Sequence, residues 1–294
     1  MEVFWVSTCS RNANFALSAE VRRDNAEEMK VVMQEANKEF SLAERLQGQY
    51  RRLSARYRAR SRVEVRLRQP VISFTFDDFP RSALYTGGAI LQKYGASGTY
   101  YASLGLMGTV APTGEIFMQQ DLPALLRMGH ELGCHTWGHC HPWTTPVEDW
   151  EVSIRRNQNS LAKIVPGAKM RSMSYPLSVP TAANKKVCER YFDCSRGRGD
   201  FLNAGIADRN FLSSHFLERK LGGPEAALHA IEENRRACGW LIFSTHDISA
   251  NPTDFGWTPE FFETVVRAAI GSGALVLTVI QAWDRIRAAA EYRL

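Results

Sequence analysis

Short apolar runs alternate with longer amphipathic segments along residues 71–292. The runs are rich in β-branched and aromatic residues, as in Val71–Phe76 (VISFTF) and Trp240–Thr245 (WLIFST), which is typical of buried strands. We predict further strands at 98–103, 131–135, 170–175, 192–195 and 275–278. We predict helices at 83–94, 121–128, 147–164, 182–191, 224–238, 259–270 and 280–292. This alternation indicates an α/β fold with a parallel sheet, open or closed into a barrel.

The first 69 residues follow a different pattern. Helix-favouring residues predominate at 19–57, where Ser18 is a candidate N-cap and no proline interrupts the segment. An arginine-rich stretch ends at Pro70, which favours an extended backbone before it. We therefore divide the chain into an N-terminal helical, arginine-rich extension at 1–69 and a second domain at 70–294.

The excess positive charge lies in this extension. The formal net charge is +5. Residues 1–70 contain 14 basic and 9 acidic residues, which leaves 22 of each in the rest of the chain. A domain without net charge lacks the positive surface that binds nucleic acid, so we expect no nucleic acid to bind. Eight arginines at 51–68 face only one acid, Glu64, and a solvated helix or tail is favoured over contact with an anionic polymer or lipid.

Composition narrows the class of protein further. Hydrophobic residues make up 45% of the 294 residues and aromatic residues 11%, which is enough for a substantial core. No apolar run reaches the roughly 18–20 residues of a membrane-spanning helix, and no segment near Met1 resembles a signal peptide. The six cysteines form no CxxC pair. We expect a soluble cytoplasmic protein with reduced thiols and no membrane span.

Reactive side chains directly follow four of the predicted strands. Asp77 and Asp78 follow VISFTF, and His246 follows WLIFST. His135 ends the strand at 131–135, and Tyr175 ends the strand at 170–175. Because ligands of such folds bind at the carboxyl ends of the strands, we expect these side chains to meet at one site.

Two histidines and an acidic pair have the chemistry of a metal site. His135 and His139 are four residues apart, a spacing that places both imidazoles on one face of a helical turn. The adjacent carboxylates Asp77 and Asp78 repel each other unless a cation or a proton neutralises one, or unless they stay solvated at a turn. Two imidazoles and one carboxylate are a familiar ligand set for a divalent metal with open positions.

Three motifs together resemble the polysaccharide deacetylase family, the NodB-homology carbohydrate esterases. They are TFDD at 75–78, HTWGH at 135–139 and LIFSTHD at 241–247, and the similarity covers about residues 70–285. The resemblance implies a distorted (β/α) barrel, here with the N-terminal helical extension added. It also implies metal-dependent removal of N-acetyl groups from a polysaccharide, an oligosaccharide or a glycoconjugate, so the expected partner is an acetylated sugar.

The resemblance assigns a role to each motif residue. Asp77 would act as the general base, and His246 as the general acid that protonates the leaving amine. Asp78, His135 and His139 would bind the divalent metal, usually zinc. A metal in that place polarises an acyl carbonyl and lowers the pKa of water, which is the help that amide hydrolysis needs.

Three of the family's motifs are altered in this chain. The fourth, usually Asp-x-Trp, has no clean match, and the stretch at 196–203 lies in about its place. Phe79 and Pro80 follow the acidic pair where the family has glycine, which stiffens the turn and adds bulk near the mouth. Ser174 stands where the family has the arginine that orients the catalytic aspartate. Arg171 lies on the same predicted strand three residues earlier, so it would project to the other face.

Five residues are candidates for the missing functions and for substrate contact. Arg196 or Arg198 would replace the missing arginine and Asp200 would tune His246, although a solvated glycine-rich loop explains this stretch equally well. Tyr175 and Trp257 are candidate substrate contacts, with core packing the alternative for the tryptophan.

Two other functions remain open on these residues. The same site would serve an O-acetyl esterase, because ester cleavage requires less protonation of the leaving group. A catalytically impaired glycan-binding or scaffold protein would keep the metal ligands alone. The presence of both Asp77 and His246, which are not needed to hold a metal, favours the enzyme.

Overall fold

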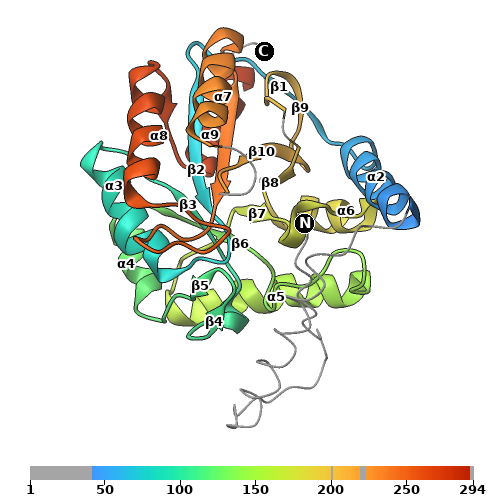
Figure 1. Ribbon diagram of the computed structural model, residues 1–294. Coiled ribbons are helices and arrows are strands. Elements are labelled where there is room, and N and C mark those ends of the chain that lie inside the picture. Colours follow the sequence, from blue (N-terminus) through green and yellow to red (C-terminus); the bar gives the residue numbers. More distant parts are fainter. Residues whose placement is uncertain (1–41, 200, 219–222, 292–294) are drawn as a thin grey trace.

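Seven parallel strands close into a barrel at the centre of the molecule (Figure 1). The structure, a computed structural model, describes residues 42–199, 201–218 and 223–291. In order around the barrel, the strands are β2 (Val71–Phe76), β3 (Thr99–Ala102), β6 (Glu131–Cys134), β7 (Ser172–Ser174), β8 (Cys194–Arg198), β10 (Leu212–Phe216) and β11 (Trp240–Thr245). The last strand pairs with the first over six residues, from Trp240 opposite Val71 to Thr245 opposite Phe76. The distorted (β/α) barrel predicted from the sequence is confirmed.

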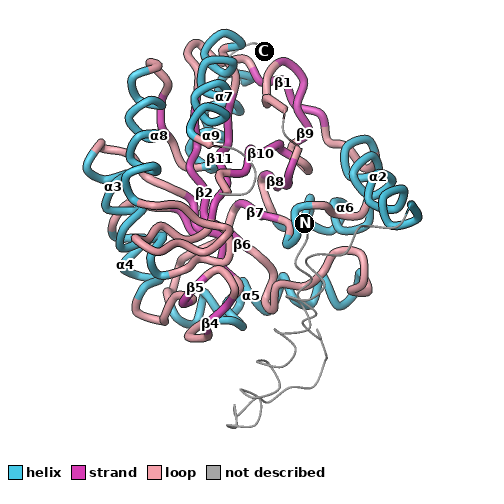
Figure 2. Tube along the Cα trace, in the orientation of Figure 1, coloured by secondary structure: helices cyan, strands magenta, loops and turns pink. Residues whose placement is uncertain are grey.

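Helices surround the barrel on the outside (Figure 2). They are the π-helical segment Ala83–Gly88 continued by α3 (Ala89–Lys93), α4 (Asp121–Arg127), α5 (Val147–Ile164), α6 (Ala182–Tyr191), α7 (Pro224–Ala237), α8 (Pro259–Gly271) and α9 (Val279–Glu291). Three of these helices have a recognisable start: α6 follows a threonine cap, α7 begins with proline, and α8 has both. In α8, the Thr258 side chain accepts a hydrogen bond from the backbone N–H of Phe261. Each predicted helix of the second domain is present, with ends that differ by no more than one residue.

Smaller elements complete the chain between and beside the barrel strands. Strand β12 (Leu275–Val276) pairs with the start of β2 outside the closed ring. Strand β1 (Arg62–Val65) pairs antiparallel with β9 (Gly205–Asp208), and β4 (Val110–Ala111) pairs with β5 (Gly114–Glu115). Single turns of 3₁₀ helix lie at Leu104–Leu106 and Pro176–Ser178.

The sequence did not reveal all the strands. The arginine-rich stretch contains β1, which was not predicted. The barrel strand β10 (LSSHF) was also not predicted, because it is rich in polar residues. The strand expected at 192–195 instead runs from Cys194 to Arg198, so the glycine-rich stretch begins inside the sheet. The helix expected at 19–57 is described only as α2 (Leu42–Tyr57), and the rest of that prediction lies outside the described residues.

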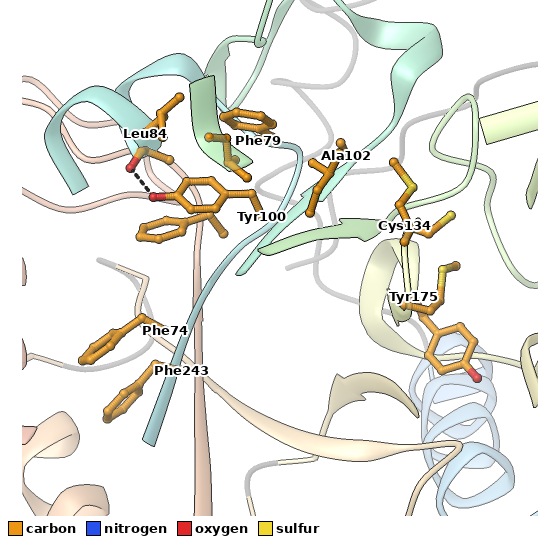
Figure 3. Packing of buried hydrophobic residues seen from close by; sticks show 14 of the residues in the cluster. Phe74, Phe79, Leu84, Tyr100, Ala102, Cys134, Tyr175 and Phe243 are labelled. Carbon is orange, nitrogen blue, oxygen red and sulfur yellow. Dashed lines mark hydrogen bonds between the residues drawn. The ribbon is translucent and has the colours of Figure 1, made fainter. Parts of the chain in front are cut away.

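Alternate residues of the barrel strands belong to different apolar clusters. On β2, Phe74 joins the larger cluster between the barrel and its helices, where its ring stacks on Phe243 with 5.6 Å between centroids (Figure 3). Val71 belongs to a second cluster with Ile242 of β11 and Trp283 of α9. This alternation, two residues per repeat, places successive side chains on opposite faces and continues to the end of each strand.

The helix α2 is attached to the barrel through a buried lysine. The Nζ atom of Lys185, on α6, donates hydrogen bonds to the carbonyl oxygens of Ala55 (2.9 Å) and Arg58 (2.7 Å) at the end of α2. The same ammonium pairs with Asp208 at 2.7 Å. A cation at the C-terminal end of a helix satisfies carbonyls that have no partner within the helix.

Two further predictions concern membrane-spanning helices and the state of the cysteines. In the part that the structure describes, no helix is both long and apolar enough to cross a lipid bilayer. The described cysteines, 134, 140, 188, 194 and 238, are free thiols.

Candidate metal centre and active-site cavity

A cavity of about 810 Å³ lies over the carboxyl ends of the barrel strands. Its floor includes the predicted residues Asp77, Asp78, His135, His139 and His246. The opposite wall is formed by α2, eight of whose residues line the cavity. This volume falls within the range of ligand-binding pockets, about 300–1,000 Å³.

Three side chains on the floor lie around one point. Oδ1 of Asp78 is 3.6 Å from Nε2 of His135 and 3.5 Å from Nε2 of His139. Ligand atoms of the three residues all lie within 4.8 Å of one another. These separations exceed a hydrogen bond but suit atoms that share an ion at about 2.0–2.2 Å each. The structure thus brings the three predicted ligands together.

The surroundings of these side chains fit a divalent metal. Nδ1 of His135 is 2.8 Å from the carbonyl oxygen of Ser174, which can only accept a hydrogen bond, so Nε2 carries the lone pair toward the site. Burial lowers the pKa of His135 to about 4 and keeps the ring neutral. Oδ1 of Asp78 is buried without a hydrogen-bond partner among the described residues, while Oδ2 accepts from Thr113 at 3.1 Å. Such outer partners are typical of metal ligands.

Backbone conformation at the floor is unusual. Non-glycine residues with positive φ include Asp78 (58°) and His139 (52°), both candidate ligands, and Thr136 (61°) between the two histidines. Two more, Leu177 and Ser178, follow β7 at the same end of the barrel. Side chains rarely adopt this region unless the surrounding structure enforces it, and such residues concentrate at functional sites.

Asp77, next to the ligand Asp78, pairs with Arg196. It extends the inward-facing row of β2, and its backbone N–H donates to the carbonyl of Thr245 at 2.9 Å. The carboxylate lies 2.5 Å from the guanidinium of Arg196 and accepts a bond from the Ser244 hydroxyl. Burial alone would raise the pKa of Asp77, but Arg196 and then His135 and His246 lower it to about 2. Asp77 is therefore an ionised, held carboxylate beside the candidate metal site.

Arg196 supplies the charge that the family motif places elsewhere. It is fully buried on β8, and its guanidinium lies 4.7 Å from the ring centroid of Tyr101. Arg171, the arginine in the corresponding stretch, instead pairs with Asp193 and Asp284 at the outside of the barrel. The expectation that Arg171 projects to the other face is confirmed, and of the two candidate replacements it is Arg196 that contacts Asp77.

His246 follows β11 and lines the same cavity, where its charge lowers the pKa of Asp77. Its ring makes an edge contact with Phe255, with 5.6 Å between centroids, and its Nδ1 is buried without a hydrogen-bond partner within the described residues. Glu218 lines the same cavity, and burial raises the pKa of Glu218 while His246 opposes that rise. Glu218 was not among the predicted site residues, because it follows β10, a strand that was not predicted.

The other predicted contacts have different outcomes. Arg198 lines the cavity, and its guanidinium lies 5.2 Å from the ring centroid of Phe216. Tyr175 and Trp257 do not line it. The Tyr175 side chain is buried in the core, where its hydroxyl donates to the carbonyl of Asn210 at 2.9 Å (Figure 3). Trp257 stacks on Phe261 with 3.7 Å between centroids, so core packing is the correct interpretation for both. Asp200 lies outside the described residues.

The prediction that Phe79, the residue after the acidic pair, adds bulk near the mouth of the site was wrong. Phe79 adds no bulk at the mouth, because it is fully buried in the core (Figure 3). Its ring stacks on Phe117 with 4.7 Å between centroids. Its positive φ of 51° turns the chain after Asp78, so an apolar side chain anchors the turn that the family makes with glycine. The largest omission is the α2 wall, whose place above the floor had no local signal in the sequence.

Comparison with known proteins agrees with the fold. Residues 64–191 match the family described as polysaccharide deacetylase. No curated protein sequence matches the chain. The matched stretch contains two of the three motifs, TFDD and HTWGH, so the chain is similar to the polysaccharide deacetylase family over this stretch. The family is one of hydrolases that depend on a metal.

Solved structures share the barrel at low sequence identity. A CE4 family pseudoenzyme from Bacillus anthracis is 12% identical, with 76% of this chain and 68% of that chain covered and a TM-score of 0.53. A family 4 acetyl xylan esterase from Clostridium thermocellum, in complex with a cobalt ion, is 18% identical, with 73% and 90% covered and a TM-score of 0.51. The Xyl-CE4 domain of a multidomain xylanase from the hindgut metagenome of Trinervitermes trinervoides is 15% identical, with 74% and 91% covered and a TM-score of 0.50.

Proposed function

We propose that this protein is a metal-dependent hydrolase that removes N-acetyl groups from an N-acetylated carbohydrate. The observation that carries the proposal is the Asp78, His135 and His139 cluster in one cavity with the ionised Asp77 and with His246. In this proposal residues 70–294 form the deacetylase domain and residues 1–69 an extension to it.

Asp78, His135 and His139 would hold the metal, most simply zinc, since two imidazoles and one carboxylate are a usual catalytic zinc set. A divalent ion there would polarise the acyl carbonyl and lower the pKa of water. The hydrogen bonds from His135 to Ser174 and from Thr113 to Asp78 keep the ligands in place before the metal binds.

Asp77 would accept the proton of the attacking water. Its pKa of about 2 keeps it ionised throughout the neutral range, and its ion pair with Arg196 holds the carboxylate at the edge of the site. We assign Arg196 as a positioning residue, because it reaches the reacting atoms only through Asp77. His246 would donate a proton to the leaving nitrogen, a step that an imidazole performs near neutral pH.

Two alternatives use the same floor. An O-acetyl esterase would need the same ligands and base with less help from His246. A glycan-binding protein without turnover would need the ligands alone, and a CE4 family pseudoenzyme shares the fold. The buried pair of Asp77 and Arg196 favours an enzyme, because burying two charges has a desolvation cost that holding a metal does not require.

Acetate release tests the proposal. The substrates are N-acetylglucosamine oligomers and aryl acetates, each assayed with and without added zinc. We expect zinc-dependent release that falls at least about 100-fold in Asp77→Asn, in line with general-base contributions of roughly 10²–10⁴. Bound zinc should stay the same in this variant, since Asp77 is not a ligand.

The matched control is Glu115→Gln, which makes the same change from carboxylate to amide at an exposed residue outside the cavity. It should behave as the wild type. Equal rates for the wild type and Asp77→Asn would exclude Asp77 as the base. Release from aryl acetates but from no N-acetylated sugar would favour the esterase.

A further inference from the structure

Arginines dominate the wall that faces the metal-ligand cluster. Arg45, Arg51, Arg52 and Arg56 of α2 line the cavity together with Arg198 of β8. Arg45, Arg52 and Arg56 are spaced by seven and four residues, so they lie on one face of the helix. The arginine-rich stretch of the sequence thus contributes to the site rather than forming only a solvated tail.

The wall is built into the fold rather than resting loosely on it. Lys185 binds the end of α2 through two carbonyl oxygens and Asp208. In the middle of the helix, the Arg51 guanidinium lies over the ring of Trp143 at 5.2 Å from its centroid, and the Trp143 indole N–H donates to the Val179 carbonyl at 2.8 Å. These contacts place α2 opposite the floor in a defined position.

The carboxylates of the cavity do not balance these arginines. Asp77 is paired with Arg196, and Asp78 faces the two histidine ligands. Glu44 and Glu218 are the other acidic residues lining the cavity in the described part of the chain, against five arginines.

Three of the arginines remain available to a ligand. Among the described residues, Arg51, Arg52 and Arg56 form no ion pair, and Nε of Arg51 is buried without a hydrogen-bond partner. The guanidinium of Arg56 lies instead over the ring of Phe201, 4.8 Å from its centroid. Guanidinium groups bind carboxylate and phosphate oxygens in paired hydrogen bonds, and a buried donor without a partner is costly until something accepts from it.

We propose that α2 recognises an anionic group, a carboxylate or a phosphate, on the carbohydrate that occupies this cavity. The inference rests on the proposed function and names its substrate class: an acetylated sugar whose acyl group lies at the floor and whose negative charge lies against the arginine wall. A neutral acetylated sugar would use the floor without the wall.

Binding measurements test this without relying on turnover. The full chain carrying Asp77→Asn and loaded with zinc is titrated calorimetrically with N-acetylglucosamine, N-acetylglucosamine 6-phosphate and N-acetylmuramic acid. We expect at least one of the two anionic sugars to bind about tenfold or more tightly than the neutral sugar at low salt, and the advantage to shrink at high salt. The sugar that gains affinity identifies the group, phosphate or carboxylate.

Arginine variants show whether α2 is responsible. Arg52→Gln combined with Arg56→Gln should remove most of the anionic advantage and leave the neutral sugar unchanged. Arg60→Gln, an exposed arginine outside the cavity, is the matched control and should change neither. An anionic advantage that survives the double variant would place the anion on the metal and overturn the proposal.

The two proposals fail separately. Equal affinity for neutral and anionic sugars overturns the anionic substrate even if acetate is released. An anionic advantage that depends on Arg52 and Arg56, found without any acetate release, supports the arginine wall and contradicts only the hydrolase.

Discussion

The floor and the wall of the cavity are made in opposite ways. The floor consists of buried and half-buried groups at the ends of barrel strands, and hydrogen bonds or ion pairs hold Asp77, Asp78 and His135. The wall is one helix whose arginines, such as Arg52 and Arg56, are exposed. Chemistry requires atoms fixed within fractions of an ångström, which a closed sheet provides, whereas recognition of a charge tolerates longer, more mobile side chains. The comparison predicts that changes to the floor affect turnover and changes to the wall affect the choice of substrate.

The largest effect is expected on the floor, from Asp78→Asn. This variant removes a charged metal ligand. Mutation of the residues that hydrogen-bond to metal ligands typically lowers metal affinity roughly 10–100-fold, so loss of a ligand itself should lower zinc affinity by more. Acetate release should fall with it. Zinc content after dialysis and the rate at saturating zinc are the measurements. Asp77→Asn is the matched control, because it should keep its zinc while losing activity. Full zinc retention in Asp78→Asn would contradict the ligand assignment.

A smaller effect on turnover is expected from Arg196→Gln. Without the guanidinium, Asp77 loses the cation that most lowers its pKa, so the pKa rises and the carboxylate takes up a proton at higher pH. A base must be unprotonated to act, so the acidic limb of the kcat/KM profile should move to higher pH, with a loss of roughly 10–100-fold at the optimum.

The control for this variant is Arg171→Gln, which breaks surface ion pairs on a neighbouring strand. Its pH profile should match that of the wild type, and Arg196→Lys should recover part of the activity. A loss of activity in Arg196→Gln with an unchanged acidic limb would mean that Arg196 stabilises the barrel without acting on Asp77.

The smallest effect on turnover is expected at the wall, from Lys185→Met. The change releases the end of α2, while Asp208 keeps hydrogen bonds from the backbone N–H groups of Ser61 and Asn210. Breaking a buried pair destabilises a protein by about 3–5 kcal/mol, which thermal or chemical unfolding would show. Acetate release from a neutral oligomer should stay within about threefold, and the preference for an anionic sugar should be lost. A retained preference would mean that α2 holds its place without Lys185.

Local patterns were sufficient for the floor and insufficient for the wall. The strands VISFTF and WLIFST, and the His135 and His139 spacing, are signals within a few residues of one another, so these strands and the histidine pair could be predicted. The choice of Asp78 as the third ligand came from the family resemblance. Arg196 was a candidate only because a resemblance required an arginine nearby. Its contact with Asp77, 119 residues away, depends on the order of strands in the barrel.

Long-range packing explains why some of the predictions from the sequence were wrong or missing. Tyr175 and Phe79 adjoin motif residues but turn into the core. Tyr175 does so because alternate residues at a strand end face opposite sides, and Phe79 because the backbone turns with positive φ at Asp78 and Phe79. The position of α2 follows from Lys185, a residue whose type gives no indication of burial, and polar β10 lacks the apolar run by which strands are recognised.

The pairing of β11 with β2 also has a consequence for the order in which the protein matures. Asp77 and His246 come from the first and last strands of the ring and become neighbours only when that ring closes. The candidate metal ligands come from β2 and the segment after β6, both in the first half of the chain. During synthesis from the N-terminus, a partly folded barrel would assemble an ion site well before the acid joins the base, so hydrolysis would begin only after the closing strand is in place.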